Sequence, residues 1–249
     1  MFKKLGITLL LSGVFICAHA KDNKRLDSHV ALAAAYLLEG NPAVAKEEIQ
    51  KALDIDSSNA MANNIMGFVQ VYYNDNKEAR RYFEKAIDLD EENPDIRHNY
   101  GWFLCRSNEV DKGIAELIKA SVNPIYKTPE KSLIEAANCA LKKNDLSSAD
   151  KYFTKAIMSN PRSMELYLSL AKYHLDYTKK YDLARANFYK LYEQLKNPAP
   201  EILWLGIRIE HKLNNQYDEQ VLSEKLTKSF PDSSESTLLI NKAFDTTVN

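Results

Sequence analysis

Histidine and carboxylate side chains are the groups here that could do acid–base or metal chemistry, and their spacing disfavours both. Four histidines lie far apart in the chain: His29, His98, His174 and His211. None belongs to an H-E-x-x-H zinc motif or adjoins a Cys-x-x-Cys pair. The acidic run at residues 90–92 is typical of a solvated loop. With no G-x-S-x-G motif or phosphate-binding glycine loop, we expect no catalytic residues, metal or cofactor.

Small residues recur at a spacing of 34. This spacing indicates a repeated helical unit, which would position the histidine and carboxylate side chains. One series consists of Ala33, Gly67 and Gly101, resuming with Ala137, Ala171 and, 35 residues later, Gly206. Two further series are Ala45, Ala79, Gly113, Ala149 and Ala52, Ala86, Ala120, Ala156, and large residues keep the register at Ile49, Phe83, Leu117 and Phe153. This period and these positions are the signature of the tetratricopeptide repeat, a helix–turn–helix unit. The sequence therefore predicts an all-α, right-handed solenoid of about six such repeats.

Composition agrees with this fold class. The chain is 45% hydrophobic and has only 7 Gly and 8 Pro in 249 residues, which favours helices over a β fold. Its 33 basic and 34 acidic residues nearly balance, and no basic stripe with interleaved aromatics is present. A nucleic-acid partner is therefore not expected.

We expect one helical domain over residues 21–249, preceded by a signal peptide at 1–20. The predicted repeats are at about 26–59, 60–93, 94–127, 130–163, 164–198 and 199–232, with a cap or tail at 233–249. The fifth repeat has one extra residue near 179–181, and Asp218 replaces the usual alanine in the sixth. Such weakening of the pattern is typical of a capping repeat.

The first helices of the repeats are expected to line a concave groove that binds another protein. At one shared position, the first three repeats have Ala34, Phe68 and Trp102. The other residues expected in the groove are Val30, Leu37, Leu38, Asn64, Val71, Tyr72 and Arg106. Asn64 and Arg106 could hold polar groups of a bound chain. An apolar and aromatic floor of this kind indicates a partner; the alternative is that these side chains pack between repeats.

The N-terminus has the features of an export signal. Lys3 and Lys4 precede an apolar stretch at residues 5–16, which is short for a membrane span. Ala18-His19-Ala20 then forms an A-x-A cleavage site. We expect export from the cytoplasm of a Gram-negative bacterium, with a mature N-terminus at Lys21.

Lipidation of Cys17 is the alternative form of processing. The residues before this cysteine, Val14-Phe15-Ile16, are large, whereas lipoprotein processing prefers small residues there. Cleavage after Ala20 is therefore favoured.

Export would place Cys105 and Cys139 in an oxidising compartment, where thiols tend to pair. They fall in the first helices of consecutive repeats, which are neighbours in such a stack. A disulfide is favoured, and the alternative is two separate buried thiols.

Two stretches go beyond a generic repeat: Asn99-Tyr100-Gly101-Trp102-Phe103-Leu104-Cys105 and Leu203-Trp204-Leu205-Gly206-Ile207-Arg208. With six repeats after an export signal, the chain resembles the type IV pilus biogenesis and stability proteins of the PilF/PilW type over essentially its whole mature length. Proteins of this family are lipoproteins of the outer membrane that face the periplasm, so the poor lipidation motif at Cys17 departs from the pattern.

The resemblance implies a non-enzymatic, pilotin-like adaptor that helps the pilus secretin multimerise, reach the outer membrane or stay functional. It also implies that the groove of the early repeats binds a secretin segment. We expect a monomer in the periplasm or on the periplasmic face of the outer membrane, touching the membrane only through the secretin or a lipid anchor. The alternative is a general periplasmic scaffold for cell-envelope enzymes.

Overall fold

The computed structural model describes residues 6–246 of the chain, and for residues 6–21 it describes the backbone alone. Residues 1–5 of the predicted signal peptide therefore lie outside the described residues, as do the side chains of Cys17, Ala18 and Ala20. Within the described range no helix is both long and apolar enough to cross a membrane.

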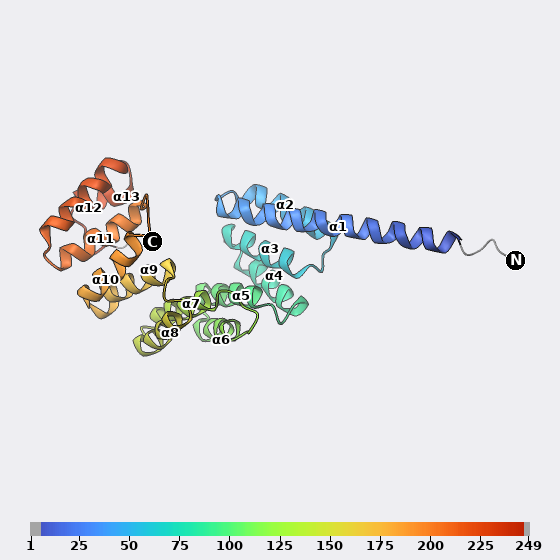
Figure 1. Ribbon diagram of the computed structural model, residues 1–249, viewed down its shortest axis with the longest axis horizontal. Helices are drawn as coiled ribbons and strands as arrows, with labels where there is room; N and C mark the ends of the chain where they lie inside the picture. The colour runs from blue at the N-terminus through green and yellow to red at the C-terminus, as the bar shows by residue number, and fades with distance from the viewer. Residues whose placement is uncertain (1–5, 247–249) are drawn as a thin grey trace. The chain divides into compact units, whose positions relative to one another are not determined.

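Residues 6–246 form thirteen α-helices and one π-helical turn, without any β-strand, as the predicted all-α class requires (Figure 1). The chain divides into two compact units, Met1–Lys127 and Thr128–Asn249, which we call the first and second units. The first unit contains α1 (Gly6–Leu38), α2 (Pro42–Ile55), α3 (Ala60–Tyr72), α4 (Asn76–Leu89), α5 (Pro94–Arg106) and α6 (Val110–Ser121). The second contains α7 (Pro129–Lys142), α8 (Leu146–Ser159), α9 (Met164–Tyr173), α10 (Tyr181–Tyr192), α11 (Pro200–Lys212), α12 (Gln216–Ser229) and α13 (Ser234–Ile240).

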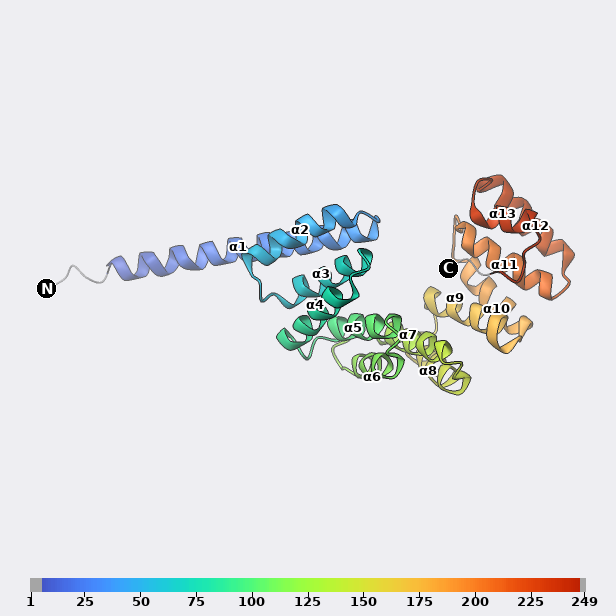
Figure 2. The same ribbon diagram turned by 180° about the vertical axis from the view of Figure 1, so that it is seen from behind.

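Consecutive helices pair into hairpins, and each unit contains three such pairs: α1 with α2, α3 with α4 and α5 with α6, then α7 with α8, α9 with α10 and α11 with α12. Toward the N-terminus α1 continues past the end of α2 as a single helix (Figures 1 and 2). Within a unit, the first helices of successive repeats also contact one another. For example, α1 contacts α3, and α3 contacts α5.

The small-residue series marks where the two helices of a pair cross. In the third repeat Gly101 of α5 faces Gly113 of α6, and a Cβ atom added to Gly113 would lie 2.7 Å from the Gly101 carbonyl oxygen. Because no side chain fits that gap, the position demands glycine. The large residue Leu117 is fully buried beside this crossing.

The turn between the two helices of each repeat uses one residue in the left-handed backbone conformation. These residues are Gly40, Asn74, Asn108, Asn144, Lys179 and Asn214, with φ between 55° and 72°. Glycine and asparagine tolerate this conformation better than other residues do. In four of these repeats the next helix is capped by a side chain that accepts from its first turn: Asn41, Asp75, Asp145 and Asn215.

The extra residue of the fifth repeat is accommodated by a π-helical turn, His174–Thr178 (η1), at the end of α9. The backbone N–H of Lys179 bonds to the carbonyl of His174, five residues earlier, and Lys179 has a φ of 55°. A π-turn takes up one residue more than an α-turn, so α10 begins without disturbing the pairing of α9 with α10.

Asp218 in the sixth repeat has a partner that explains why it replaces alanine. Arg185 of α10 donates from Nη2 to Asp218 at 2.9 Å and from Nε to Glu210 of α11 at 3.1 Å. Glu210 is fully buried, so its charge requires this pairing. Residues 234–240, in the stretch expected to be a cap or a tail, form a last helix, α13, which packs on α11 and α12.

Candidate protein-binding groove

A pocket of about 560 Å³ lies in the first unit, across the first helices of the first three repeats. Its walls come from α1, α3 and α5 and are mostly apolar. The lining residues are Ala34, Leu37, Leu38, Ile65, Phe68, Val71, Tyr72, Asn74, Trp102 and Arg106. Eight of the ten residues expected in a groove therefore lie together in this pocket, which we call the groove.

The shared register of Ala34, Phe68 and Trp102 places one residue from each of the three helices along the floor. The rings of Phe68 and Trp102 are tilted by 37°, with centroids 5.2 Å apart. Both side chains are half-buried, so they leave aromatic surface open to the pocket. Ala34 at the same position of α1 leaves space next to Phe68, because its side chain is a single methyl group.

Two exposed side chains form the rim. Leu38, the last residue of α1, is 92% exposed, and Tyr72 at the end of α3 is 51% exposed. The Tyr72 hydroxyl donates to the Leu37 carbonyl oxygen at 3.1 Å, which ties the two helix ends together. Leu38 therefore adds exposed apolar surface next to the aromatic floor of the groove.

The polar end of the groove is formed by Arg106 and Asn74. The Arg106 guanidinium lies 5.8 Å from the centroid of the Trp102 ring, a cation–π arrangement. Arg106 is exposed, so it can also meet a carboxylate of a bound segment. The groove can therefore recognise an apolar stretch of chain that has an acidic residue at one end.

Two of the expected residues do not line this pocket. Asn64 is fully buried, so the prediction that it holds a polar group of a partner is wrong. Its amide oxygen accepts from Asn99 of α5 at 3.4 Å, which places it in the packing between the second and third repeats. Val30 is half-buried and packs against the core of the first repeat instead.

Two lining residues were missed by the sequence analysis. Ile65 stands one helical turn before Phe68, so its position on the same face of α3 could have been read from helical periodicity. Asn74 lies beyond the end of α3 with a φ of 58°, and only the geometry of the turn brings it to the groove.

Phe68 also packs against the core, so the packing alternative holds in part. Its ring stands edge-on to the buried Phe83, at 87° and with centroids 5.3 Å apart. Phe83 in turn packs on Phe103, with centroids 5.1 Å apart. Phe68 is therefore both a groove residue and a support of the repeat core, and Trp102 also packs against this core cluster.

Cys105 and Cys139 are both disulfide-bonded in the structure, the state that the sequence favours for an exported chain. Both side chains are buried, at 3% and 1% exposure. Burial removes these sulfurs from solvent, which is expected of structural rather than reactive cysteines.

The histidines have structural partners in the described part of the chain. His29 Nδ1 lies 2.7 Å from Glu48, and His211 Nδ1 lies 3.2 Å from Glu219. Burial lowers the pKa of His174, and Lys180 lowers it further. Among residues whose side chains are described, no three histidine, cysteine or acidic groups cluster in a way that could hold a metal ion.

Comparisons with known proteins agree with this architecture. The tetratricopeptide repeat family matches residues 26–59, 65–93 and 130–163. The chain is 27% identical over 211 residues to the type IV pilus assembly protein PilF of Pseudomonas aeruginosa, an alignment that covers 84% of this chain and 82% of PilF.

Two solved structures share the fold. The crystal structure of PilW, a widely conserved type IV pilus biogenesis factor, has a TM-score of 0.75 and 24% identity, covering 86% of this chain and 98% of PilW. The structure of Pseudomonas aeruginosa PilF has a TM-score of 0.70 and 23% identity, covering 89% of this chain and 99% of PilF. The repeat matches identify tetratricopeptide repeats in the chain, and the sequence alignment identifies it as a homologue of PilF.

Proposed function

We propose that the protein is an exported, non-catalytic adaptor for type IV pilus biogenesis that holds a segment of the pilus secretin in the groove. The observation that carries the proposal is the groove itself, an open apolar channel across three consecutive first helices. Homology to a type IV pilus assembly protein supports the pilus as the setting. The secretin is the partner that the resemblance to the PilF/PilW proteins implies.

The chemistry of the groove favours one kind of occupant. Phe68 and Trp102 offer flat aromatic area, and Leu38 offers an exposed apolar edge. Large aromatic residues are the usual anchors of protein interfaces. Arg106 beside Trp102 adds a positive charge at one end. A secretin segment with apolar side chains and one carboxylate fits these features.

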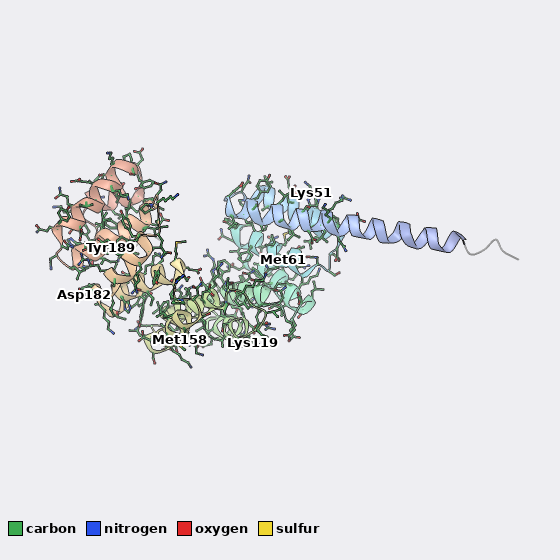
Figure 3. All side chains as sticks on the ribbon, viewed as in Figure 1. Lys51, Met61, Lys119, Met158, Asp182 and Tyr189 are labelled. Atoms are coloured by element: carbon green, nitrogen blue, oxygen red, sulfur yellow. The ribbon has the colours of Figure 1, made fainter. Side chains whose placement is uncertain are left out.

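Leu38 offers the sharpest test, because its exposure means that changing it leaves the core intact. We expect Leu38→Asp to weaken binding of the purified secretin by about 10-fold or more while the melting temperature stays the same. The matched control is Met158→Asp on α8, at an equally open apolar position that is 80% exposed (Figure 3). This control is expected to bind normally.

The second part of the test is done in cells. With Leu38→Asp in place of the native protein, surface pili are expected to be lost while cell shape stays normal. Normal pili together with altered cell shape would contradict the pilus role and favour a scaffold for envelope enzymes. Normal secretin binding by Leu38→Asp and by Trp102→Ala would contradict the groove as the binding site.

A further inference from the structure

The C-terminal segment, residues 241–246, lies along α11, the first helix of the sixth repeat. After α13 the chain reverses: Ala243 N–H bonds to the Leu238 carbonyl, Lys242 N–H bonds to the Leu239 carbonyl, and Lys242 has a φ of 53°. This is a helix-ending turn of the Schellman type. It directs residues 243–246 back toward α11.

Side chains of α11 hold this segment by its backbone. Trp204 donates from Nε1 to the Thr246 carbonyl oxygen at 3.2 Å, and Arg208 donates from Nε to the Phe244 carbonyl oxygen at 2.9 Å. Residues 243–246 form a turn, closed by the bond from the Thr246 N–H to the Ala243 carbonyl at 2.9 Å, and both donors of α11 bind main-chain carbonyls of this turn. Every peptide unit has a carbonyl acceptor, so these two bonds do not depend on the side chains of the segment. Such main-chain recognition is how many peptide-binding proteins obtain affinity.

One aromatic side chain of the segment supplies selectivity. The ring of Phe244 stacks on His211, with centroids 3.8 Å apart and planes at 12°, and on Trp204, at 5.8 Å and 18°. Next to it, Asp245 pairs with Lys212 at 2.6 Å, although the Asp245 side chain is 87% exposed. The face of α11 therefore selects an aromatic residue followed by an acidic one, and the acidic contact is sensitive to salt.

The donors of α11 are fixed by the rest of the second unit. Trp204 is 2% exposed and Arg208 is 7% exposed. Arg208 also donates from Nη2 to Asp176 at 2.6 Å, and Asp176 belongs to the π-turn η1. A site whose donors are held in place without the ligand loses little entropy on binding. Trp204 and Arg208 have these low exposures with the segment in place, so its departure leaves both donors facing water until another carbonyl acceptor binds them.

We propose that this face of α11 is a second peptide-binding site, occupied by the protein's own C-terminal segment until a partner segment that forms the same turn replaces it. The replacing segment has an aromatic residue followed by an acidic residue, the chemistry of Phe244 and Asp245. The turn at Lys242 is the hinge about which the segment departs. This site shares no residue with the groove, so the inference stands apart from the proposed pilus function.

The test uses a fluorescent peptide with the sequence of residues 240–249 and the full chain. A tethered segment competes at an effective concentration of about a millimolar, so it excludes the free peptide from the native protein. Phe244→Ala removes the aromatic anchor of the tethered segment. We expect this variant to bind the peptide about 10-fold or more tightly than the native protein does. A peptide with alanine in place of Phe244 is expected to bind neither protein.

A second variant covers the case in which Phe244→Ala does not fold. Asp245→Lys changes an exposed side chain and places it against Lys212, which loosens the segment and leaves the aromatic contacts of the site intact. It is also expected to bind the peptide more tightly than the native protein does. Adding Trp102→Ala to either variant is expected to change nothing, because the groove is not involved.

Equal peptide binding by the native protein and both folded variants would overturn the proposal and leave the segment as a permanent cap of α11. The absence of peptide binding by either folded variant would also overturn the proposal. A native protein that forms dimers, with the dimers lost in Phe244→Ala, would overturn the choice of a partner segment, since a second copy of the chain would then be the occupant.

Discussion

Phe68 stands edge-on to Phe83, with ring centroids 5.3 Å apart and an angle of 87° between the ring planes. One side of the Phe68 ring therefore supports the repeat core while the other lines the groove. Trp102 touches Phe68 and the open pocket. Phe68 and Trp102 both line the groove and both pack against the core, whereas Phe83 is fully buried and does not line the groove.

Alanine substitutions of these three aromatics are expected to give three different results. Trp102→Ala is expected to weaken secretin binding about 30-fold, or about 2 kcal/mol, with a small loss of stability. Phe83→Ala is expected to lower the free energy of unfolding by about 3–5 kcal/mol, because it leaves a cavity in the core. Phe68→Ala is expected to affect both. Denaturation curves and binding titrations on the same preparations check this order, and equal stability losses at all three sites would contradict it.

The disulfide provides a second prediction. A bond between Cys105 and Cys139 closes a loop of 34 residues, which on the chain-entropy account stabilises the folded state by roughly 3–4 kcal/mol. Replacing both cysteines by serine is expected to lower the melting temperature as much as a reductant does. The reductant is expected to leave the double variant unchanged, and this is the control. Alkylation of both thiols in denatured, unreduced protein from the periplasm would show that the bond is absent there.

Glu135 of α7 is expected to make stability depend on pH. Burial and, to a smaller extent, the nearby Glu165 together raise the pKa of Glu135 to about 7, against an ordinary value of 4.5. The folded state then holds this proton more tightly than the unfolded state, so stability falls as the pH rises from about 4.5 to about 7 and is level above that. Glu135→Gln removes the buried charge.

We expect Glu135→Gln to raise the free energy of unfolding by about 1–2 kcal/mol at pH 8 and to change it little at pH 4.5. Urea denaturation at both pH values measures this difference. The exposed Glu193 in the same unit offers a matched control, and Glu193→Gln is expected to have no such effect. A gain for Glu135→Gln that is the same at both pH values would rule out this explanation.

Processing of the N-terminus is the fourth prediction. We expect the native protein to begin at Lys21 with no acyl chain, because Ala18-His19-Ala20 is a better cleavage site than the residues before Cys17. The intact mass of protein purified from its own cells decides this. A diacylated or triacylated species beginning at Cys17 would contradict it and would favour attachment to the outer membrane.

Most of the fold could be predicted from the repeat period, because small and large residues at fixed positions determine where helices cross. Gly101 and Gly113 meet as that period predicts. The same period predicted that Phe68 and Trp102 share one register, and both line the groove. Asn64 shows the limit: whether a polar residue on a first helix faces the groove or the next repeat depends on small rotations of the helix. The contacts of the C-terminal segment with Trp204 lie outside any repeat pattern, so sequence periodicity could not indicate them.

The π-turn after α9 confines the extra residue of the fifth repeat to one end of one helix. It stores one residue in a wider helical turn, so α10 and α11 keep the pairings that a repeat of ordinary length would give them. That same residue brings Asp176 within 2.6 Å of Arg208. A lineage that gains or loses a single codon here would retain its solenoid and change how firmly Arg208 is held. Insertions at helix ends of this kind are thus a route by which repeat proteins acquire new contacts without redesigning their cores.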